Sequence, residues 1–234
     1  MTIHYRDTST HSLKVESAPP ARLAGPRADS FKPQLYRNAG KRVLDVILCI
    51  LGAPFALLLI GVMALLVARD GGAPFYSQDR VGRGGRIYRM WKLRTMVPDA
   101  DAKLKAHLAE NTAARTEWDR DQKLKSDPRV TRLGALLRRA SMDELPQLWN
   151  VFKGDMSLVG PRPMMPEQKT LYPGSEYYTL RPGITGSWQI SDRNESSFAE
   201  RAIFDTSYSR NVSLGEDIRI LVATVRVVLK ATGY

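Results

Sequence analysis

Residues 43–68 read VLDVILCILGAPFALLLIGVMALLVA, an apolar run of 26 residues whose only charged side chain is Asp45. Lys41 and Arg42 precede the run, and Arg69 follows it. As a helix, this run is long enough to cross the hydrocarbon core of a bilayer, so it predicts a membrane segment. A buried core helix is disfavoured because the run is apolar on every face and longer than one side of a small domain.

Ala53-Pro54 lies near the middle of this segment. Proline removes a backbone hydrogen bond and clashes with the preceding turn, so we expect the helix to break there. Residues 1–42 hold eight basic and three acidic side chains, and residues 69–234 are also net positive. Positive charge favours the cytoplasmic side for both flanks. We therefore predict a re-entrant helix-break-helix over residues 41–69, with a kinked span as the alternative.

The composition narrows the class of protein further. The chain has 234 residues, 43% of them hydrophobic, which suits a packed core and excludes wholesale disorder. Cys49 is the single cysteine, so a disulfide framework and a Cys-rich zinc module are excluded, and we place this thiol in lipid. The net charge of +11 indicates an anionic partner such as nucleotide phosphate, nucleic acid or a membrane leaflet. Residues 1–40 lack apolar periodicity and predict a flexible basic tail.

Residues 70–234 predict a small, mainly helical α+β domain that faces the cytoplasm. Residues 75–78 and 87–93 have the pattern of a hairpin around Gly82-Arg-Gly-Gly85. These glycines are not followed by the Lys and Ser or Thr of a phosphate loop, so we interpret them as a turn. Helices are predicted at residues 99–121, 129–139 and 143–152 from apolar positions three or four apart.

The C-terminal segment predicts an amphipathic helix. Ser213 and Glu216 form a capping-box pattern at its start. Its apolar side chains share one face, opposite Arg219, Arg226 and Lys230: Ile218, Leu221, Val222, Val225 and Leu229. Both core packing and a place at the lipid interface fit this pattern. For the four tryptophans the default expectation is the core: Trp91, Trp118, Trp149 and Trp188.

The polar centre of the chain lies in DPRVTRLGALLRRASMDELPQLWN, residues 127–150, followed by GDMSLVGPRP, residues 154–163. Asp143 and Glu144 are adjacent carboxylates among several arginines. They fit a capping box with Ser141, but Pro146 would then lie where its missing N–H is needed. If the helix begins near Pro146 instead, both acids lie just before a helix N-terminus, a place suited to phosphate or to a metal that bridges phosphates.

The order of motifs resembles a known family. The motifs are KLRTM at 92–96, DELPQ at 143–147, the 154–163 run, RPGITG at 181–186 and the 205–217 block. Over roughly residues 40–230 they resemble the bacterial sugar transferases, also called monotopic phosphoglycosyl transferases. The resemblance implies a re-entrant membrane helix broken at a small residue followed by proline, which Ala53-Pro54 matches.

The resemblance also implies an activity at the bacterial inner membrane, with the catalytic domain facing the cytoplasm. Sugar 1-phosphate, in exopolysaccharide-type members from glucose or galactose, passes from a UDP-sugar to undecaprenyl phosphate. Asp143 would be the nucleophile that expels UMP, and Glu144 would hold Mg²⁺ with it. The positions expected near phosphates or the nucleotide are Lys92, Arg94, Arg138, Pro161, Arg162 and Pro163. The residues alone support an anion site with carboxylates near a membrane.

Two other functions are compatible with parts of the sequence. A membrane-anchored basic adaptor would bind anionic lipid or, less plausibly, nucleic acid, but it gives no reason for adjacent acids among arginines. Hydrolysis of the nucleotide sugar would use water as acceptor. The identity of the sugar and the oligomeric state are not indicated by any motif.

Overall fold

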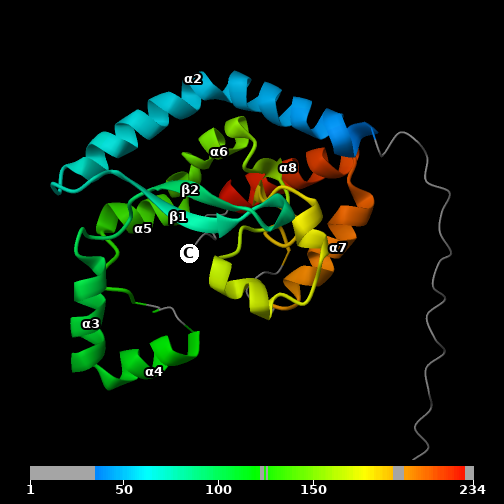
Figure 1. Cartoon of the computed structure of the whole chain (residues 1–234). Coiled ribbons are helices and arrows are strands. Elements are labelled where there is room, and N and C mark those ends of the chain that lie inside the picture. Colours follow the sequence, from blue (N-terminus) through cyan, green and yellow to red (C-terminus); the bar gives the residue numbers. More distant parts are fainter. Residues whose placement is uncertain (1–34, 122–123, 125, 192–197, 230–234) are drawn as a thin grey trace, which may run out of the picture. The chain divides into compact units, whose positions relative to one another are not determined.

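The computed structural model describes residues 35–121, 124, 126–191 and 198–229, all of which belong to one unit, Phe31–Tyr234 (Figure 1). Most of the predicted tail, residues 1–40, therefore lies outside the described residues. Seven helices and two two-stranded sheets are described, which is compatible with the predicted α+β class. The helices are α2 Lys41–Ala68, α3 Ala100–Glu110, α4 Thr112–Asp121, α5 Arg132–Arg139, α6 Gln147–Lys153, α7 Arg201–Asn211 and α8 Leu214–Leu229. The strands are β1 Phe75–Val81, β2 Ile87–Leu93, β3 Ser157–Val159 and β4 Gly183–Thr185.

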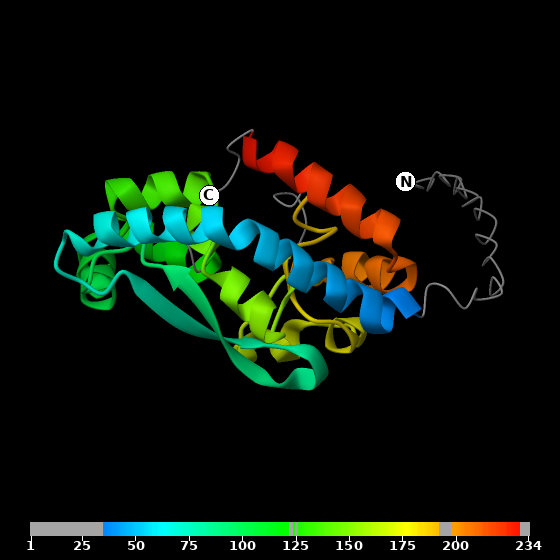
Figure 2. The same cartoon turned by 90° about the horizontal axis from the view of Figure 1, so that it is seen from above.

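The membrane segment forms α2, which is preceded by a π-helical turn, η1 Tyr36–Gly40. This helix is continuous through Pro54, whereas the sequence led us to expect two helices separated by a break. Figures 1 and 2 show it arching as one ribbon. A proline costs the helix one hydrogen bond and a local clash, and the remaining bonds keep a bent helix intact. By length and composition α2 is able to cross a membrane.

One side of α2 is attached to the rest of the unit along its length. At its start, the Nζ of Lys41 lies 2.6 Å from the Asp217 carboxylate of α8. In the middle, Cys49 is buried against α6, with its Sγ 3.9 Å from the Leu148 carbonyl oxygen, so the placement of this thiol in lipid was wrong. At the end, Val67 is buried in a cluster with residues of β2 and α5. Most other apolar side chains of α2 are exposed.

The predicted hairpin is confirmed and is longer than expected. Strands β1 and β2 pair antiparallel from Phe75 opposite Leu93 to Val81 opposite Ile87. The turn between them, η2 Arg83–Gly85, has Gly84 and Gly85 at φ of 68° and 78°. Side chains rarely adopt this backbone conformation, which explains the glycine-rich sequence of the turn.

A second sheet joins two of the motifs. Strands β3 and β4 pair in parallel, with Ser157 opposite Gly183. At Gly160 an added Cβ would lie 2.3 Å from the Arg181 carbonyl oxygen, and at Gly183 it would lie 2.1 Å from the Gly160 nitrogen. The glycines of the 154–163 and 181–186 motifs therefore allow two backbones to approach closely.

Helix ends in the middle of the chain follow local caps. The helix predicted at 99–121 is two helices, because the Asn111 side chain accepts a hydrogen bond from Ala114 N at 3.0 Å and starts α4. Helix α5 begins at Arg132 rather than at Arg129, because the Thr131 hydroxyl accepts from Gly134 N at 2.8 Å. Two short 3₁₀ segments, η4 Pro166–Leu171 and η5 Glu176–Thr179, connect β3 to β4.

Of the two hydrogen bonds in the capping box predicted for α8, the structure shows the one that Ser213 accepts. The Ser213 hydroxyl accepts from Glu216 N at 3.3 Å, but the Glu216 carboxylate pairs with Arg219. Asp217 and Ile220 point into the core and are fully buried. The apolar stripe on the outer side is 44–57% exposed: Leu214, Ile218, Val222 and Val225. Of the predicted face, Ile218, Val222 and Val225 are therefore not core residues, whereas Leu221 packs against a core cluster as the core expectation has it. The side chain of Leu229 lies outside those described, and for the exposed stripe the lipid-interface interpretation stays.

Candidate functional site

The two adjacent carboxylates lie in a single 3₁₀ turn, η3 Met142–Glu144, between α5 and α6. Ser141 precedes this turn in the left-handed region, at φ 55°, and its side chain makes no cap hydrogen bond. Helix α6 begins directly after Pro146. The start predicted at residue 143 is therefore wrong, since the α-helix begins at Gln147. The alternative, a start near Pro146 that leaves both acids before the helix, is confirmed, and the capping-box interpretation is wrong.

Lys92 of β2 joins both carboxylates. Its Nζ lies 2.7 Å from Glu144 Oε1 and 3.8 Å from Asp143 Oδ2. Asp143 is 8% exposed, and this burial raises the pKa of its carboxyl group. Glu144 raises this pKa further, whereas the positive charges of Lys92 and Arg138 lower it. The site thus holds a carboxylate away from water next to a fixed cation.

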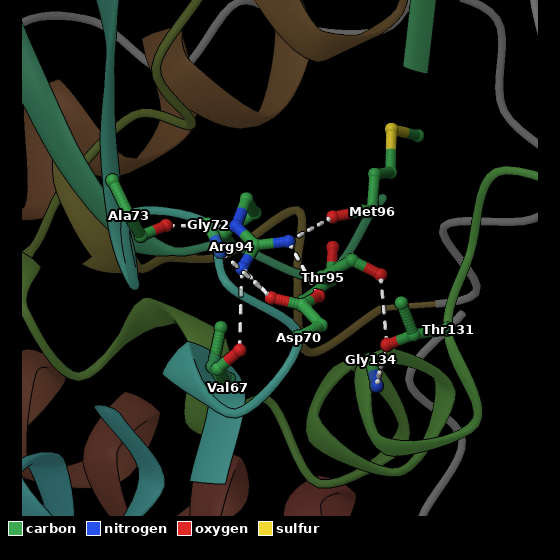
Figure 3. Close-up of polar contacts among 9 residues, drawn as sticks. All are labelled: Val67, Asp70, Gly72, Ala73, Arg94, Thr95, Met96, Thr131 and Gly134. Carbon is green, nitrogen blue, oxygen red and sulfur yellow. Dashed lines mark hydrogen bonds and ion pairs between the residues drawn. The ribbon is translucent and has the colours of Figure 1, made fainter. Parts of the chain in front are cut away.

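Arg138 reaches the site from α5. Its Nε donates to the Thr95 hydroxyl at 2.9 Å, and Thr95 is itself buried just after β2. The Thr95 carbonyl accepts from Thr131 N at 3.1 Å. The same carbonyl oxygen lies so close to Gly134 that a Cβ added to this glycine would be only 2.0 Å from it. Figure 3 shows Gly134 next to Thr95 and Thr131. Helix α5 is therefore held tightly to the end of the hairpin, which fixes the position of Arg138.

Arg94, which the resemblance placed near phosphates, faces a different set of partners. Its guanidinium donates to both carboxylate oxygens of Asp70 and to the carbonyls of three further residues, as Figure 3 shows: Val67, Ala73 and Met96. These contacts engage all of its N–H groups and lower the pKa of Asp70 to about 2. Arg94 thus links the end of α2 to the hairpin through these hydrogen bonds. None of its described contacts is with Asp143.

A cavity of about 400 Å³ opens beside Glu144. Its polar wall includes Arg162 and Gln189, and its apolar wall comes from α2, α6 and α8. Gln189 is 7% exposed, and neither atom of its amide has a hydrogen-bond partner among the described residues. A buried amide without partners is costly, so this side chain is suited to a ligand. Sequence analysis missed Gln189, although it closely follows the 181–186 motif.

Arg162, in the Pro161-Arg162-Pro163 segment, is one of the residues that line this cavity. The Arg162 guanidinium lies 5.6 Å from the centre of the Trp188 ring, and that of Arg201 lies 4.3 Å from the same ring. Burial, followed by the charge of Arg162, lowers the pKa of Arg201 to about 10. Two arginines held around one ring create a positive region that favours anions. Arg201 was not predicted, because it lies outside the motif runs.

The tryptophans do not share one environment. Trp188 is 8% exposed and matches the core expectation. Trp149 of α6 is 57% exposed and stacks on Phe152 at 5.8 Å, so the core expectation is wrong for this residue. It lies beside α2, where its ring and those of its neighbours line an apolar cavity of about 600 Å³.

The predicted magnesium site has few protein ligands. Among the described residues there is no group of three or more His, Cys, Asp or Glu side chains that could hold a metal ion. Asp143 and Glu144 offer two carboxylates, both of them already close to Lys92. Magnesium is commonly held by one or two carboxylates together with substrate phosphates. The residues therefore fit Mg²⁺ if phosphate oxygens complete its coordination.

Comparison with known proteins places this arrangement in a family. The model of the family described as "Bacterial sugar transferase" matches residues 36–231. The chain belongs to the bacterial sugar transferase family. It is 46% identical over 195 residues to the UDP-galactose-lipid carrier transferase of Erwinia amylovora. It is 44% identical over 195 residues to the undecaprenyl-phosphate galactose phosphotransferase of Salmonella typhimurium.

Family membership confirms the resemblance that the motifs carry. Each of these two matches covers 82% of the chain but only 41% of the relative, so the chain spans about two fifths of their length. The exopolysaccharide production protein ExoY of Sinorhizobium fredii is 44% identical over 199 residues, which cover 87% of it. The shorter relative thus matches almost from end to end.

Proposed function

We propose that the protein transfers hexose 1-phosphate, from glucose or galactose, from a UDP-sugar to undecaprenyl phosphate. The products are undecaprenyl diphosphate sugar and UMP, and the reaction is the first membrane step of exopolysaccharide or related glycan synthesis. The names of the relatives support the lipid phosphate and the polysaccharide. The observation that carries the proposal is the buried Asp143 beside Lys92, next to a cavity with a polar and an apolar wall.

The proposed chemistry has two displacements at one phosphorus atom. An oxygen of Asp143 attacks the phosphorus on the sugar side of the diphosphate, and the bond to the UMP oxygen breaks. The resulting sugar-phosphoryl aspartate is then attacked by an oxygen of undecaprenyl phosphate, which restores the carboxylate. Lys92 orients Asp143 and favours its charged form, while Arg138 and Arg162 offset phosphate charge. Bound Mg²⁺ would supply further charge neutralisation between the two anionic substrates.

The cavity beside Glu144 suits a lipid phosphate as acceptor. Arg162 and Gln189 offer hydrogen-bond donors at one side, and Leu59 of α2 with Leu221 and Val228 of α8 line the apolar side. A phosphate attached to a hydrocarbon chain needs both kinds of wall. Water as acceptor would gain nothing from the apolar side, which favours transfer over hydrolysis.

The attachment of α2 supports a re-entrant or in-plane arrangement at the cytoplasmic leaflet of the inner membrane. Lys41 at its start is paired with Asp217 of α8, and Val67 at its end packs on Leu93 of β2. Both ends of α2 therefore contact residues 70–234. A helix that crosses the bilayer would carry one of these ends to the opposite surface. The bend at Pro54 and the positive flanks agree with return to the same side.

The test is release of UMP by detergent-purified protein with Mg²⁺ and a panel of UDP-sugars, with and without undecaprenyl phosphate. We expect release that needs the lipid phosphate, favours one sugar and is lost in Asp143→Asn. Asp119→Asn, an exposed carboxylate of α4, serves as the matched control and should keep full activity. Lipid-independent release would instead indicate hydrolysis, and full turnover by Asp143→Asn would remove the nucleophile from the mechanism.

A further inference from the structure

A second, larger cavity lies at the tip of the hairpin. It has a volume of about 710 Å³ and shares no lining residue with the cavity beside Glu144. Four arginines from separate parts of the chain line it: Arg37 of η1, Arg83 of the hairpin turn, Arg86 after the turn and Arg181 before β4. Tyr88 of β2 belongs to this cavity, and Lys92 of the same strand belongs to the site of Asp143. The two positions are four residues, or about 13 Å, apart along the strand, so the two sites are separate.

The positive charge of this cavity is not neutralised by neighbouring acids. Within the described part of the chain, no carboxylate lies within 4.0 Å of any of the four guanidinium groups. Asp155 is the acidic residue in the lining, and its Oδ2 already lies 3.0 Å from Lys153 Nζ and 3.1 Å from Asn150 Nδ2. Burial and the charge of Arg83 lower the pKa of Arg181. An anion bound here would relieve this repulsion.

The hydrogen bonds of the arginines leave their charge available. Arg37 donates to the Ser209 carbonyl at 2.7 Å and to the Thr179 hydroxyl at 3.0 Å, both neutral acceptors. Arg181 donates its Nε to the Gly154 carbonyl. These bonds hold two guanidinium groups in place from the protein side. Arg83 and Arg86 are exposed, and their side chains make no hydrogen bond within the described residues.

Tyr88 adds an independent observation. Tyr88 is one of the lining residues and is 9% exposed, its ring packs in a core cluster, and its buried hydroxyl has no hydrogen-bond partner among the described residues. A buried hydroxyl is nearly always paired in a folded protein. A ligand oxygen that reaches this hydroxyl through a small shift of the ring would supply the missing partner.

The structure assigns to this cavity a binding site for a phosphate-bearing anion, separate from the transfer site. Arginines suit phosphate because their planar N–H groups bind two oxygens at once. The volume falls in the range of small-molecule sites. Arg37 lies six residues before the apolar run, so the phosphate could belong to an anionic lipid headgroup at the membrane surface or to a soluble compound.

The test is calorimetric titration of the detergent-purified full chain with pyrophosphate and, separately, with dihexanoyl phosphatidylglycerol below its micelle concentration. Dihexanoyl phosphatidylcholine is the control for the lipid. We expect binding of one of the two anions, weakened about tenfold or more in Arg83→Gln/Arg86→Gln. Tyr88→Phe should weaken it severalfold. Arg89→Gln, an exposed arginine on β2 outside the cavity lining, is the matched control and should bind as the wild type does.

The outcomes separate the two sources and the two sites. Binding of pyrophosphate supports a soluble ligand, and binding of phosphatidylglycerol alone supports a lipid headgroup. Equal loss in Arg89→Gln would reduce the site to diffuse charge, and displacement of the anion by UDP-sugar would place it in the donor site. Failure of folded wild type to bind either anion would also overturn the inference. UMP release should persist in Arg83→Gln/Arg86→Gln, so this test stands apart from that of the transferase.

Discussion

Burial disfavours the charge of Asp143, and the cations of Lys92 and Arg138 favour it. Lys92 forms an ion pair with this carboxylate at 3.8 Å, and it also binds Glu144. Replacing it leaves two carboxylates in a largely dry site without their shared cation. The consequence should be seen in catalysis rather than only in stability.

We expect Lys92→Met to lower kcat for UMP release by about 100-fold or more, because one fixed charge in a preorganised site has an effect of this size. Lys92→Arg should restore part of the loss. Circular dichroism and thermal melting check that both variants fold. Activity of Lys92→Met within twofold of wild type would show that this cation has no part in the reaction.

Asp205 makes stability depend on pH. It is buried, accepts a hydrogen bond from Tyr172 at 2.7 Å, and burial raises its pKa to about 6. A carboxyl whose pKa is higher in the folded state binds its proton more readily there, so folding is favoured as the pH falls from 6 towards 4. Relative to Asp205→Asn, the wild type should lose up to about 3 kcal/mol of unfolding free energy between pH 4 and pH 7.

Urea denaturation of both proteins across this pH range measures the difference. The comparison with Asp205→Asn cancels the titration of other groups, because the amide keeps the size of the side chain and can accept the bond from Tyr172. A difference that is constant from pH 4 to pH 7 would show that Asp205 has an ordinary pKa.

Residue patterns pointed to Asp143 and Glu144, and the family resemblance added Lys92, but neither could separate Lys92 from Arg94. Both lie in one motif and two positions apart, which is the spacing of one strand face. The strand ends at Leu93, and Arg94 leaves it to meet Asp70. The partner of each cation depends on where the strand stops, which local sequence does not specify.

Among the elements, the close pairing of β3 with β4 leaves no room for a side chain at Gly160, directly after β3. A Cβ would lie 2.3 Å from the Arg181 carbonyl oxygen, so the backbones would have to move apart. We expect Gly160→Ala to lower the free energy of unfolding by about 2 kcal/mol or more. Gly215→Ala in α8 is the matched control, since its Cβ would meet nothing within 4 Å.

Helix propensity makes the Gly215→Ala control neutral or slightly stabilising. Chemical denaturation of both variants provides the comparison. Equal stability of Gly160→Ala and wild type would show that the two strands have room to separate.

Elements that follow from strong local signals were predictable. Elements that depend on whether a local preference outweighs the hydrogen bonds and packing around it were not. The hairpin and α8 follow from turn glycines and from Ser213, whose effects are local. The split at Asn111 was hidden because apolar periodicity continues across it. The break at Pro54 was overestimated, since the loss of one hydrogen bond bends α2 without ending it.

For the whole molecule, the exposed stripe of α8 and the outer side of α2 form the apolar surface that would meet lipid. A fluorophore on Val222→Cys, in a Cys49→Ala background in nanodiscs, should be quenched by spin-labelled lipid. The same label on Ala113→Cys of α4, an exposed residue, should not be quenched. Equal quenching at both positions would show that α8 does not face the membrane.

The arrangement of α2 has its own test. Val43→Cys and Leu65→Cys, near the two ends of the helix, should both react with a membrane-impermeant thiol reagent from the same side of sealed vesicles. Both positions are exposed in the unit. Phe55→Cys at the bend should be protected. Labelling of the two ends from opposite sides would show that the helix spans the bilayer.

The positive charge of both flanks favours one side of the membrane for the two ends of α2, but charge alone does not indicate how the helix is held there. That arrangement depends on long-range partners such as Lys41 with Asp217, which are 176 residues apart. The cavity beside Glu144 also depends on long-range contacts, because Glu144, Gln189 and α8 come together only when the chain folds. Motif order indicated the family, and tertiary contacts determine the surroundings of each motif.

The most direct test of the covalent transfer is the mass of the protein after incubation with UDP-galactose or UDP-glucose and Mg²⁺ in the absence of lipid acceptor. We expect one added hexose phosphate, located by peptide mapping on Asp143 and removed by undecaprenyl phosphate. Asp143→Asn should gain no mass. An adduct on another residue, or no adduct in rapidly quenched wild type that releases UMP with the acceptor, would contradict a covalent step at Asp143.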